Sequence, residues 1–289
     1  MKACIKKAKQ HNKNSKIILI GDSSNSDLAK IHYNIDCESS PLLKDIAAFK
    51  KLYTHRSGLS SSFERFCIER WILVRNLMTH LDLEACCAID SDVLFFSGVQ
   101  EFLDEVPGFA MSFGRWDQKM FLPHFNLIQD RNALESFCLF AIEVYKNKSL
   151  LKKISAESSA DGGRTWICDM LLFWKWSQEN PHYKLAIYDK QPSGHSYFDL
   201  SIGRTEGFAH SRFHLGVVKK WKKISFQHGH AFAEDASAHT VKMKFIHYHG
   251  IFKVLMGRHA RGKKDTFTCF LLVLKAKLIY ELLRPLRKK

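Results

Sequence analysis

The sequence predicts an α/β domain with a mixed, mainly parallel sheet flanked by helices. Three observations support this class. Short apolar runs typical of buried parallel strands alternate with longer segments of helical periodicity. The chain has 289 residues, of which 46% are hydrophobic and 25% charged, and this is enough to bury a sizeable core. The first two apolar runs both lead into an aspartate, and open α/β sheets bind ligands at such strand ends.

The first part of the chain is expected to alternate helix, strand and helix. Residues 2–11 have the spacing of a short amphipathic helix. The β-branched run at residues 16–20 is typical of a buried strand, and it stops at Gly21. Residues 41–52 and 63–80 are expected to be helical, and three serines before the second of these helices can cap it.

The second part continues this alternation as far as residue 188. Further strands are expected at residues 85–89, 107–113 and 185–188, with helices at residues 132–145 and 166–178 between them. Residues 189–240 are rich in His, Gly and Ser and show little periodicity. Residues 244–250 close the body of the domain, and residues 266–284 are expected to form a basic amphipathic helix.

Positive charge is concentrated at the two ends of the chain. The net charge is +15, yet residues 1–16 carry six Lys without an acid, and residues 253–289 carry eleven Lys or Arg against two acids. The segment between them is therefore neutral, whereas a nucleic-acid binder more often carries its charge on the folded face. We expect no nucleic-acid partner, and instead an anionic ligand or an anionic membrane surface.

Several features favour a cytoplasmic location. The longest apolar run is six residues, too short to span a membrane, and we expect no cleavable signal peptide. None of the eight cysteines forms a Cys-x-x-Cys pair, and most lie inside apolar patterns, as in proteins of a reducing compartment. We expect a cytoplasmic protein that can also lie peripherally on the inner face of the membrane.

Two aspartates after a strand predict a metal site. Asp90 and Asp92 follow the apolar run at residues 85–89, and two carboxylates so close together are costly unless a cation neutralises them. Oxygen ligands favour Mg²⁺ or Mn²⁺, and such an ion can bridge to a substrate diphosphate. The alternative is an acidic turn that caps the next helix.

A second motif supplies groups that would complete such a site. His247 offers an imidazole as a further metal ligand, Gly250 lets the backbone approach a phosphate, and Lys253 places a point charge on it. A third candidate is Gly21-Asp22, because a carboxylate after a strand can accept hydrogen bonds from a base or a ribose. The alternative for His247 is that it is only a polar residue within a strand. The alternative for Gly21-Asp22 is an ordinary strand-to-loop turn.

Together these motifs resemble the GT-A-type glycosyltransferases, most closely family 8 and related bacterial polysaccharide glycosyltransferases. That family has an apolar strand leading into Asp-x-Asp and, much later, His-x-x-Gly-x-x-Lys. The matching residues are Asp90, Asp92, His247, Gly250 and Lys253. The Pro-Trp that often follows the family's lysine is absent, since Val-Leu stands there.

The resemblance spans residues 1–257 and implies a GT-A, Rossmann-like nucleotide-diphospho-sugar transferase fold. The chain begins within the family's first helix, so we expect the first strand to be missing, and residues 258–289 form a separate basic tail. The resemblance also implies hexosyl transfer from a nucleotide-sugar donor held through Mn²⁺ or Mg²⁺. The acceptor would be a saccharide or a lipid-linked saccharide in surface polysaccharide assembly.

The resemblance assigns two further residues. The family carries an arginine on the helix before Asp-x-Asp, and Arg70 stands 20 residues before Asp90. An acid at a later helix start faces the donor sugar in that family, and Asp169 occupies such a position. It would act as a general base in an inverting enzyme or position hydroxyls in a retaining one. The alternative is an acid that only stabilises the helix N-terminus.

Other functions are consistent with parts of the sequence. A phosphatase using Asp-x-Asp is disfavoured, because that class carries the motif near its start, with Thr or Val four residues after the nucleophile. Here Leu94 stands at that position. A non-enzymatic protein that binds RNA or anionic lipid through its basic ends is a second rival. The main alternative is a catalytically degenerate GT-A-fold protein that binds nucleotide or anionic lipid without turnover.

Overall fold

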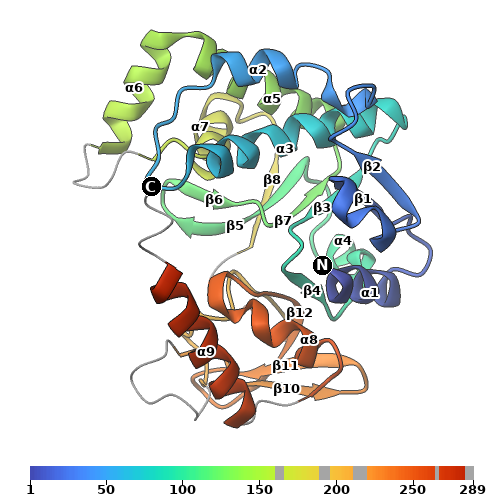
Figure 1. The fold of residues 1–289 in the computed structure, drawn as a ribbon. Helices are drawn as coiled ribbons and strands as arrows, with labels where there is room; N and C mark the ends of the chain where they lie inside the picture. Colours follow the sequence, from blue (N-terminus) through green and yellow to red (C-terminus); the bar gives the residue numbers. More distant parts are fainter. Residues whose placement is uncertain (160–165, 189–195, 211–219, 264–266, 284–289) are drawn as a thin grey trace. The chain divides into compact units, whose positions relative to one another are not determined.

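The computed structural model describes residues 1–159, 166–188, 196–210, 220–263 and 267–283 (Figure 1). The chain is an α/β protein with mixed sheets, and it divides into two compact units that are each formed from separate segments. The first unit comprises Met1–Ile17, Asp90–Glu105 and Tyr188–Lys289. The second unit comprises Ile18–Ile89 and Val106–Ile187.

The second unit contains two sheets and the helices that pack with them. Strands β1 and β2 form a parallel pair, and the larger sheet has the order β3-β7-β5-β6, with β8 paired to β5. The strands of the second unit are β1 (Ile18–Gly21), β2 (Ile31–Asn34), β3 (Cys86–Ile89), β5 (Met111–Asp117), β6 (Met120–Leu122), β7 (Phe125–Ile128) and β8 (Leu185–Tyr188). Its helices are α2 (Ile46–Leu52), α3 (Ser61–His80), α5 (Arg131–Lys146), α6 (Lys148–Ser159) and α7 (Asp169–Glu179), with short 3₁₀ turns η1 (Ser23–Leu28) and η2 (Pro41–Leu43).

The core of the second unit lies between α3, α5, α7 and the larger sheet. Helix α3 begins where Ser60 accepts a hydrogen bond from the backbone N–H of Phe63, so the predicted serine cap is present. On α5 and α7, Phe137 and Phe173 stack with ring centroids 3.5 Å apart, and both side chains are fully buried. This aromatic packing holds in place the start of α7, where Asp169 lies.

The first unit is built around one long strand. Strand β12 (Thr240–His247) pairs antiparallel with β11 (His230–Glu234) and β4 (Val93–Phe95), and parallel with β9 (Ser196–Phe198). Strand β10 (Ile224–Gln227) extends the sheet beyond β11. The helices are α1 (Lys2–His11), α4 (Val99–Glu105), α8 (Met256–His259) and α9 (Phe267–Leu283), with the 3₁₀ turn η3 (Gly250–Leu255) directly after β12.

The structure corrects the predicted direction of the strands. Among the described residues most strand pairs are antiparallel, including β3 with β7, whereas the sequence predicted a mainly parallel sheet. Strands β5, β6 and β7, and likewise β10, β11 and β12, are joined by connections of a few residues, whereas a parallel crossover would need a dozen or more. The segment 189–240 also contains β9, β10 and β11, which its weak periodicity did not indicate.

Two predicted helices have different limits in the structure. The helix expected at residues 41–52 is divided into η2 and α2, because Asp45 between them adopts a left-handed backbone with φ of 67°. The helix expected at residues 166–178 begins only at Asp169, because Cys168 is extended. Helix α6 was not predicted.

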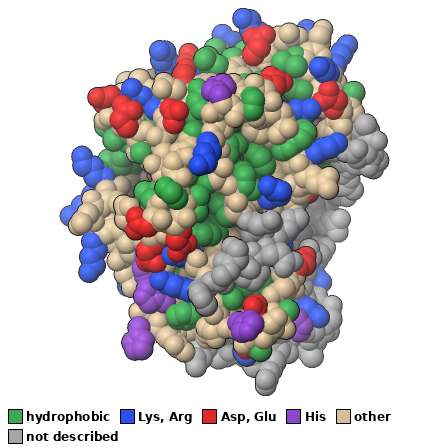
Figure 2. Space-filling model, turned by 180° about the vertical axis from the view of Figure 1, so that it is seen from behind, with side chains coloured by type: hydrophobic (Ala, Val, Ile, Leu, Met, Phe, Trp, Pro, Cys, Tyr) green, Lys and Arg blue, Asp and Glu red, His purple; other side chains and the backbone are tan. Residues whose placement is uncertain are grey.

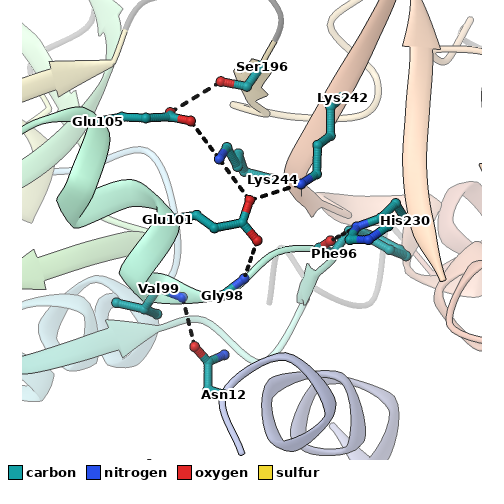
Figure 3. Close-up of polar contacts among 10 residues, drawn as sticks. All are labelled: Asn12, Phe96, Gly98, Val99, Glu101, Glu105, Ser196, His230, Lys242 and Lys244. Carbon is teal, nitrogen blue, oxygen red and sulfur yellow. Dashed lines mark hydrogen bonds and ion pairs between the residues drawn. The ribbon is translucent and has the colours of Figure 1, made fainter. Parts of the chain in front are cut away.

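Ion pairs tie helix α4 to strand β12 in the first unit (Figure 3). Glu101 accepts hydrogen bonds from Nζ of Lys242 at 2.9 Å and of Lys244 at 3.1 Å, and Glu105 lies 2.7 Å from the latter ammonium. Asn12 accepts a hydrogen bond at 2.7 Å from the backbone N–H of Val99 at the start of α4. These contacts hold in place strand β12, whose last residue is the candidate metal ligand His247.

Glu101 is expected to make the first unit sensitive to acid. Partial burial raises the pKa of this carboxyl, but hydrogen bonds from Lys242 and Lys244 outweigh it and lower the pKa to about 2. The stabilisation is therefore present above the unfolded-state value of 4.5 and is lost as the pH falls towards 2. The side chain is 42% exposed, so solvent screening reduces the contribution to about 1 kcal/mol.

The test compares melting temperatures of the wild type and Glu101→Gln at pH 7, 4 and 2. The variant should be less stable at pH 7, and the difference should shrink as the pH falls. Asp104→Asn, an exposed acid on the same helix, is the control and should show no such trend. A difference between wild type and Glu101→Gln that is the same at all three pH values would contradict the assignment.

Helix α9 packs one face on the first unit and leaves another exposed. Cys269, Phe270 and Val273 are buried, and α9 contacts η3. Leu271 and Leu278 lie on another side of the helix, since they are 47% and 55% exposed. The side chains of Leu282, Leu286 and the basic residues from Arg284 onwards lie outside the described part of the chain.

Charge is mixed in sign on one face of the protein (Figure 2). Figure 2 shows Lys and Arg side chains interspersed with Asp and Glu on the face that it draws, without one continuous basic patch. Among the described helices, none combines the length and the hydropathy needed to cross a membrane.

Candidate metal centre

The site starts at the turn between β3 and β4. Asp90 follows the last residue of β3, and Asp92 precedes the first residue of β4. The turn is closed by a hydrogen bond of 3.1 Å from the backbone N–H of Val93 to the carbonyl oxygen of Asp90. Because the two aspartates are only two residues apart, both carboxyl groups lie on one short turn. Asp92 is 7% exposed there, and Asp90 is half-buried.

Strand pairing brings His247 to this turn. In the antiparallel register of β4 and β12, His247 lies opposite Val93, and the backbone N–H of Tyr248 donates to the carbonyl oxygen of Asp92 at 2.9 Å. One ligand atom from each of Asp90, Asp92 and His247 lies within 4.8 Å of the others. The predicted convergence of these three residues is therefore a feature of the structure.

The hydrogen bond at the far side of the His247 ring defines its tautomer. Nδ1 lies 2.8 Å from the carbonyl oxygen of Leu200, and a carbonyl can only accept, so Nδ1 carries the proton. In the neutral ring, Nε2 then carries a lone pair instead of a proton, and this atom lies 3.6 Å from Oδ1 of Asp92. Ligating histidines are held in this way in metalloproteins.

The geometry fits a divalent cation. Oδ1 of Asp92 is buried and accepts no hydrogen bond from any described residue. It faces the lone pair of Nε2 at a distance too long for a hydrogen bond. A buried acceptor without a partner costs about 1–3 kcal/mol, and a cation shared by these atoms would remove that cost. Carboxylate oxygens and one imidazole are ligands that Mn²⁺ and Mg²⁺ accept.

Lys253 lies beside the same carboxylate. Its ammonium is 2.9 Å from Oδ2 of Asp92, and the side chain is 57% exposed. It stands on η3, which begins at Gly250 with a φ of 62°, a conformation that glycine adopts without strain. The two aspartates outnumber the single described lysine beside them. A divalent cation bound by these carboxylates would add positive charge and favour an anionic ligand.

Gly21 and Asp22 lie in the second unit and form a local turn. Oδ1 of Asp22 accepts hydrogen bonds from the backbone N–H of Ser24 at 2.9 Å and from Nδ2 of Asn25 at 2.9 Å, and so caps η1. A Cβ on Gly21 would lie 2.1 Å from Oδ1 of Asn25, so glycine allows this close packing. These contacts are those of an ordinary strand-to-loop turn, the alternative interpretation of this motif. A role in nucleotide binding remains a prediction.

Arg70 and Asp169 form an ion pair in the second unit. Oδ2 of Asp169 accepts hydrogen bonds from the guanidinium of Arg70 at 2.7 Å and from Nε1 of Trp71 at 3.1 Å. Asp169 is 4% exposed and is the first residue of α7. The sequence assigned these residues separate roles, and the structure brings them together.

Glu64 is a buried acid that the sequence analysis did not select. Burial, together with the nearby charge of Asp169, raises its pKa to about 7, against a hydrogen bond from Ser57 that lowers it. Its position on α3, four residues before Ile68 and seven before Trp71, places it on the buried face. That spacing was the signal available in the sequence.

The comparisons with known proteins supply no family. A scan of the sequence against protein-family models found no match, and a search among curated proteins found no match either.

Proposed function

We propose that this protein is a metal-dependent glycosyltransferase of the GT-A type that uses a nucleotide-sugar donor. The observation that carries the proposal is the cluster of Asp90, Asp92 and His247, with the ammonium of Lys253 at its edge. Two carboxylates and an imidazole beside a single lysine suit a ligand that consists of a divalent cation and a diphosphate.

Each residue has a distinct part in the proposed reaction. Asp90, Asp92 and His247 would hold Mn²⁺ or Mg²⁺, which supplies charge neutralisation for a diphosphate leaving group. Lys253 would add a point charge next to the same group, and Gly250 gives the backbone room to approach it. Gly21, Asp22 and Arg70 are proposed to contact the base and ribose.

Asp169 is proposed to face the donor sugar. Arg70 and Trp71 hold its carboxylate in one orientation, so it is suited to position hydroxyl groups or to accept a proton. The proposed acceptor is a saccharide or a lipid-linked saccharide of a surface polysaccharide, as the resemblance implies.

The test is the release of nucleoside diphosphate from a panel of nucleotide sugars, with and without Mn²⁺. We expect one donor to be hydrolysed slowly without an acceptor, only when the metal is present, and at least about tenfold faster than in a blank reaction. Calorimetry of the corresponding nucleoside diphosphate supplies the second measurement. Metal-dependent binding without turnover would identify a degenerate member of the fold. Neither binding nor turnover would overturn the proposal.

A further inference from the structure

A fully buried ion pair lies behind His247. Asp199 and Lys222 both have side chains with no exposed surface, and Nζ of Lys222 donates to Oδ1 of Asp199 at 2.8 Å. The same ammonium donates to the carbonyl oxygen of Ser201 at 2.7 Å and lies 5.0 Å from the centre of the Phe208 ring. A buried pair of this kind is not in general a source of stability, because desolvation offsets the attraction.

The other oxygen of Asp199 is directed to His247. Oδ2 accepts a hydrogen bond of 3.1 Å from the backbone N–H of His247. The next carbonyl along the chain, that of Leu200, accepts from Nδ1 of the same histidine at 2.8 Å. The backbone N–H of Ile202 donates to the carbonyl oxygen of His247 at 2.9 Å. Residues 199–202 therefore contact the backbone and the ring of His247 at three points.

Lys222 fixes the segment that makes these contacts. Its ammonium holds Asp199 and Ser201 together, and its backbone N–H donates to the carbonyl oxygen of Ile202 at 2.8 Å. With the segment held in place, Leu200 can accept from Nδ1 only when the ring is oriented so that Nε2 faces Asp92.

We propose that the Asp199–Lys222 pair is a positioning device that presets the orientation and tautomer of His247 for metal binding. This inference rests on the metal centre of the proposed function. Groups that orient a ligating histidine typically change metal affinity by about 10–100-fold when they are removed.

The test uses two double variants that both remove the buried charges. In Asp199→Asn/Lys222→Gln, the Asn oxygen can still accept from the backbone N–H of His247, and the two amides can bond to each other and to the carbonyl oxygen of Ser201. In Asp199→Leu/Lys222→Met, apolar groups of similar size leave that N–H without an acceptor. Single variants are not used, because each would leave an unpaired charge in the core.

Two measurements are made on the chain of residues 1–289. Calorimetry with Mn²⁺ should give an affinity within about threefold of wild type for Asp199→Asn/Lys222→Gln, the amide pair. For Asp199→Leu/Lys222→Met, the apolar pair, the affinity should fall by about 10–100-fold. Nitrogen-15 spectra without metal should show His247 as the Nδ1–H tautomer in the wild type and the amide pair, and as a mixture in the apolar pair. The His247 signals are assigned by their absence in His247→Gln.

Ile224→Ala is the matched control, since it opens the core of the same unit on β10. It should lower the melting temperature without changing the affinity for Mn²⁺. If Asp199→Leu/Lys222→Met folds, binds Mn²⁺ like wild type and keeps the Nδ1–H tautomer, this inference is overturned, while the proposed metal centre is not. A wild-type chain that takes up no Mn²⁺ would overturn the metal centre and the inference with it.

Discussion

Replacing Asp92 by Asn should abolish the binding of Mn²⁺ while the protein remains folded. The substitution removes a charged ligand and one of the two carboxylates on the β3–β4 turn. Because orienting groups alone change metal affinity by up to about 100-fold, loss of a ligand should exceed that figure. The fold should tolerate the change, since Oδ1 of Asp92 accepts no hydrogen bond from a described residue and the contact to Tyr248 uses the backbone. The ammonium of Lys253, which loses its partner Oδ2, is on a side chain that is 57% exposed and can be solvated.

Melting temperatures with and without Mn²⁺ provide the measurement. A ligand at about 100 times its dissociation constant stabilises the folded state by about 2.7 kcal/mol, so the wild type should melt at a clearly higher temperature with the ion present. Asp92→Asn should show no such increase, whereas Asp104→Asn, an exposed acid on α4, should behave like wild type. An unchanged metal-dependent increase in Asp92→Asn would rule out this carboxylate as a ligand.

Replacing Leu278 and Ile279 by Gln should release the protein from anionic vesicles. We propose that the exposed face of α9 lies on an anionic membrane surface, because both side chains are about half exposed and residues 253–289 carry a net charge of +9. Each side chain that leaves the lipid interface should cost about 1 kcal/mol, so the double variant should bind about 30-fold more weakly.

Co-sedimentation with vesicles of anionic and of neutral lipid, at low and at high salt, measures this effect. Leu139→Gln is the control, since Leu139 is also 55% exposed but lies on α5. Wild type and Leu139→Gln should sediment with anionic vesicles at low salt and should be released by high salt. Equal sedimentation of all three proteins, or of none, would show that α9 is not the membrane contact.

The sequence by itself determined the chemistry of the candidate site. The apolar run before Asp90 and the spacing of His247, Gly250 and Lys253 indicated a strand end with oxygen and imidazole ligands, and these groups are adjacent in the structure. Periodicity also located α1, α3, α5 and β8, because their apolar spacing is a property of the local sequence. The serine cap of α3 is local in the same sense.

Only the tertiary structure decided what surrounds these ligands. The pairing of β4 with β12 joins residues 150 to 154 positions apart, and no local pattern encodes that register. The acceptor for Nδ1 of His247 is a backbone carbonyl, which every residue carries, so its partner could not be read from residue types. Asp199 and Lys222 lie in the weakly periodic segment, where a buried ion pair has the same sequence appearance as two surface charges. Strand direction was mispredicted for the same reason, because apolar runs record burial while pairing partners depend on the path of the whole chain.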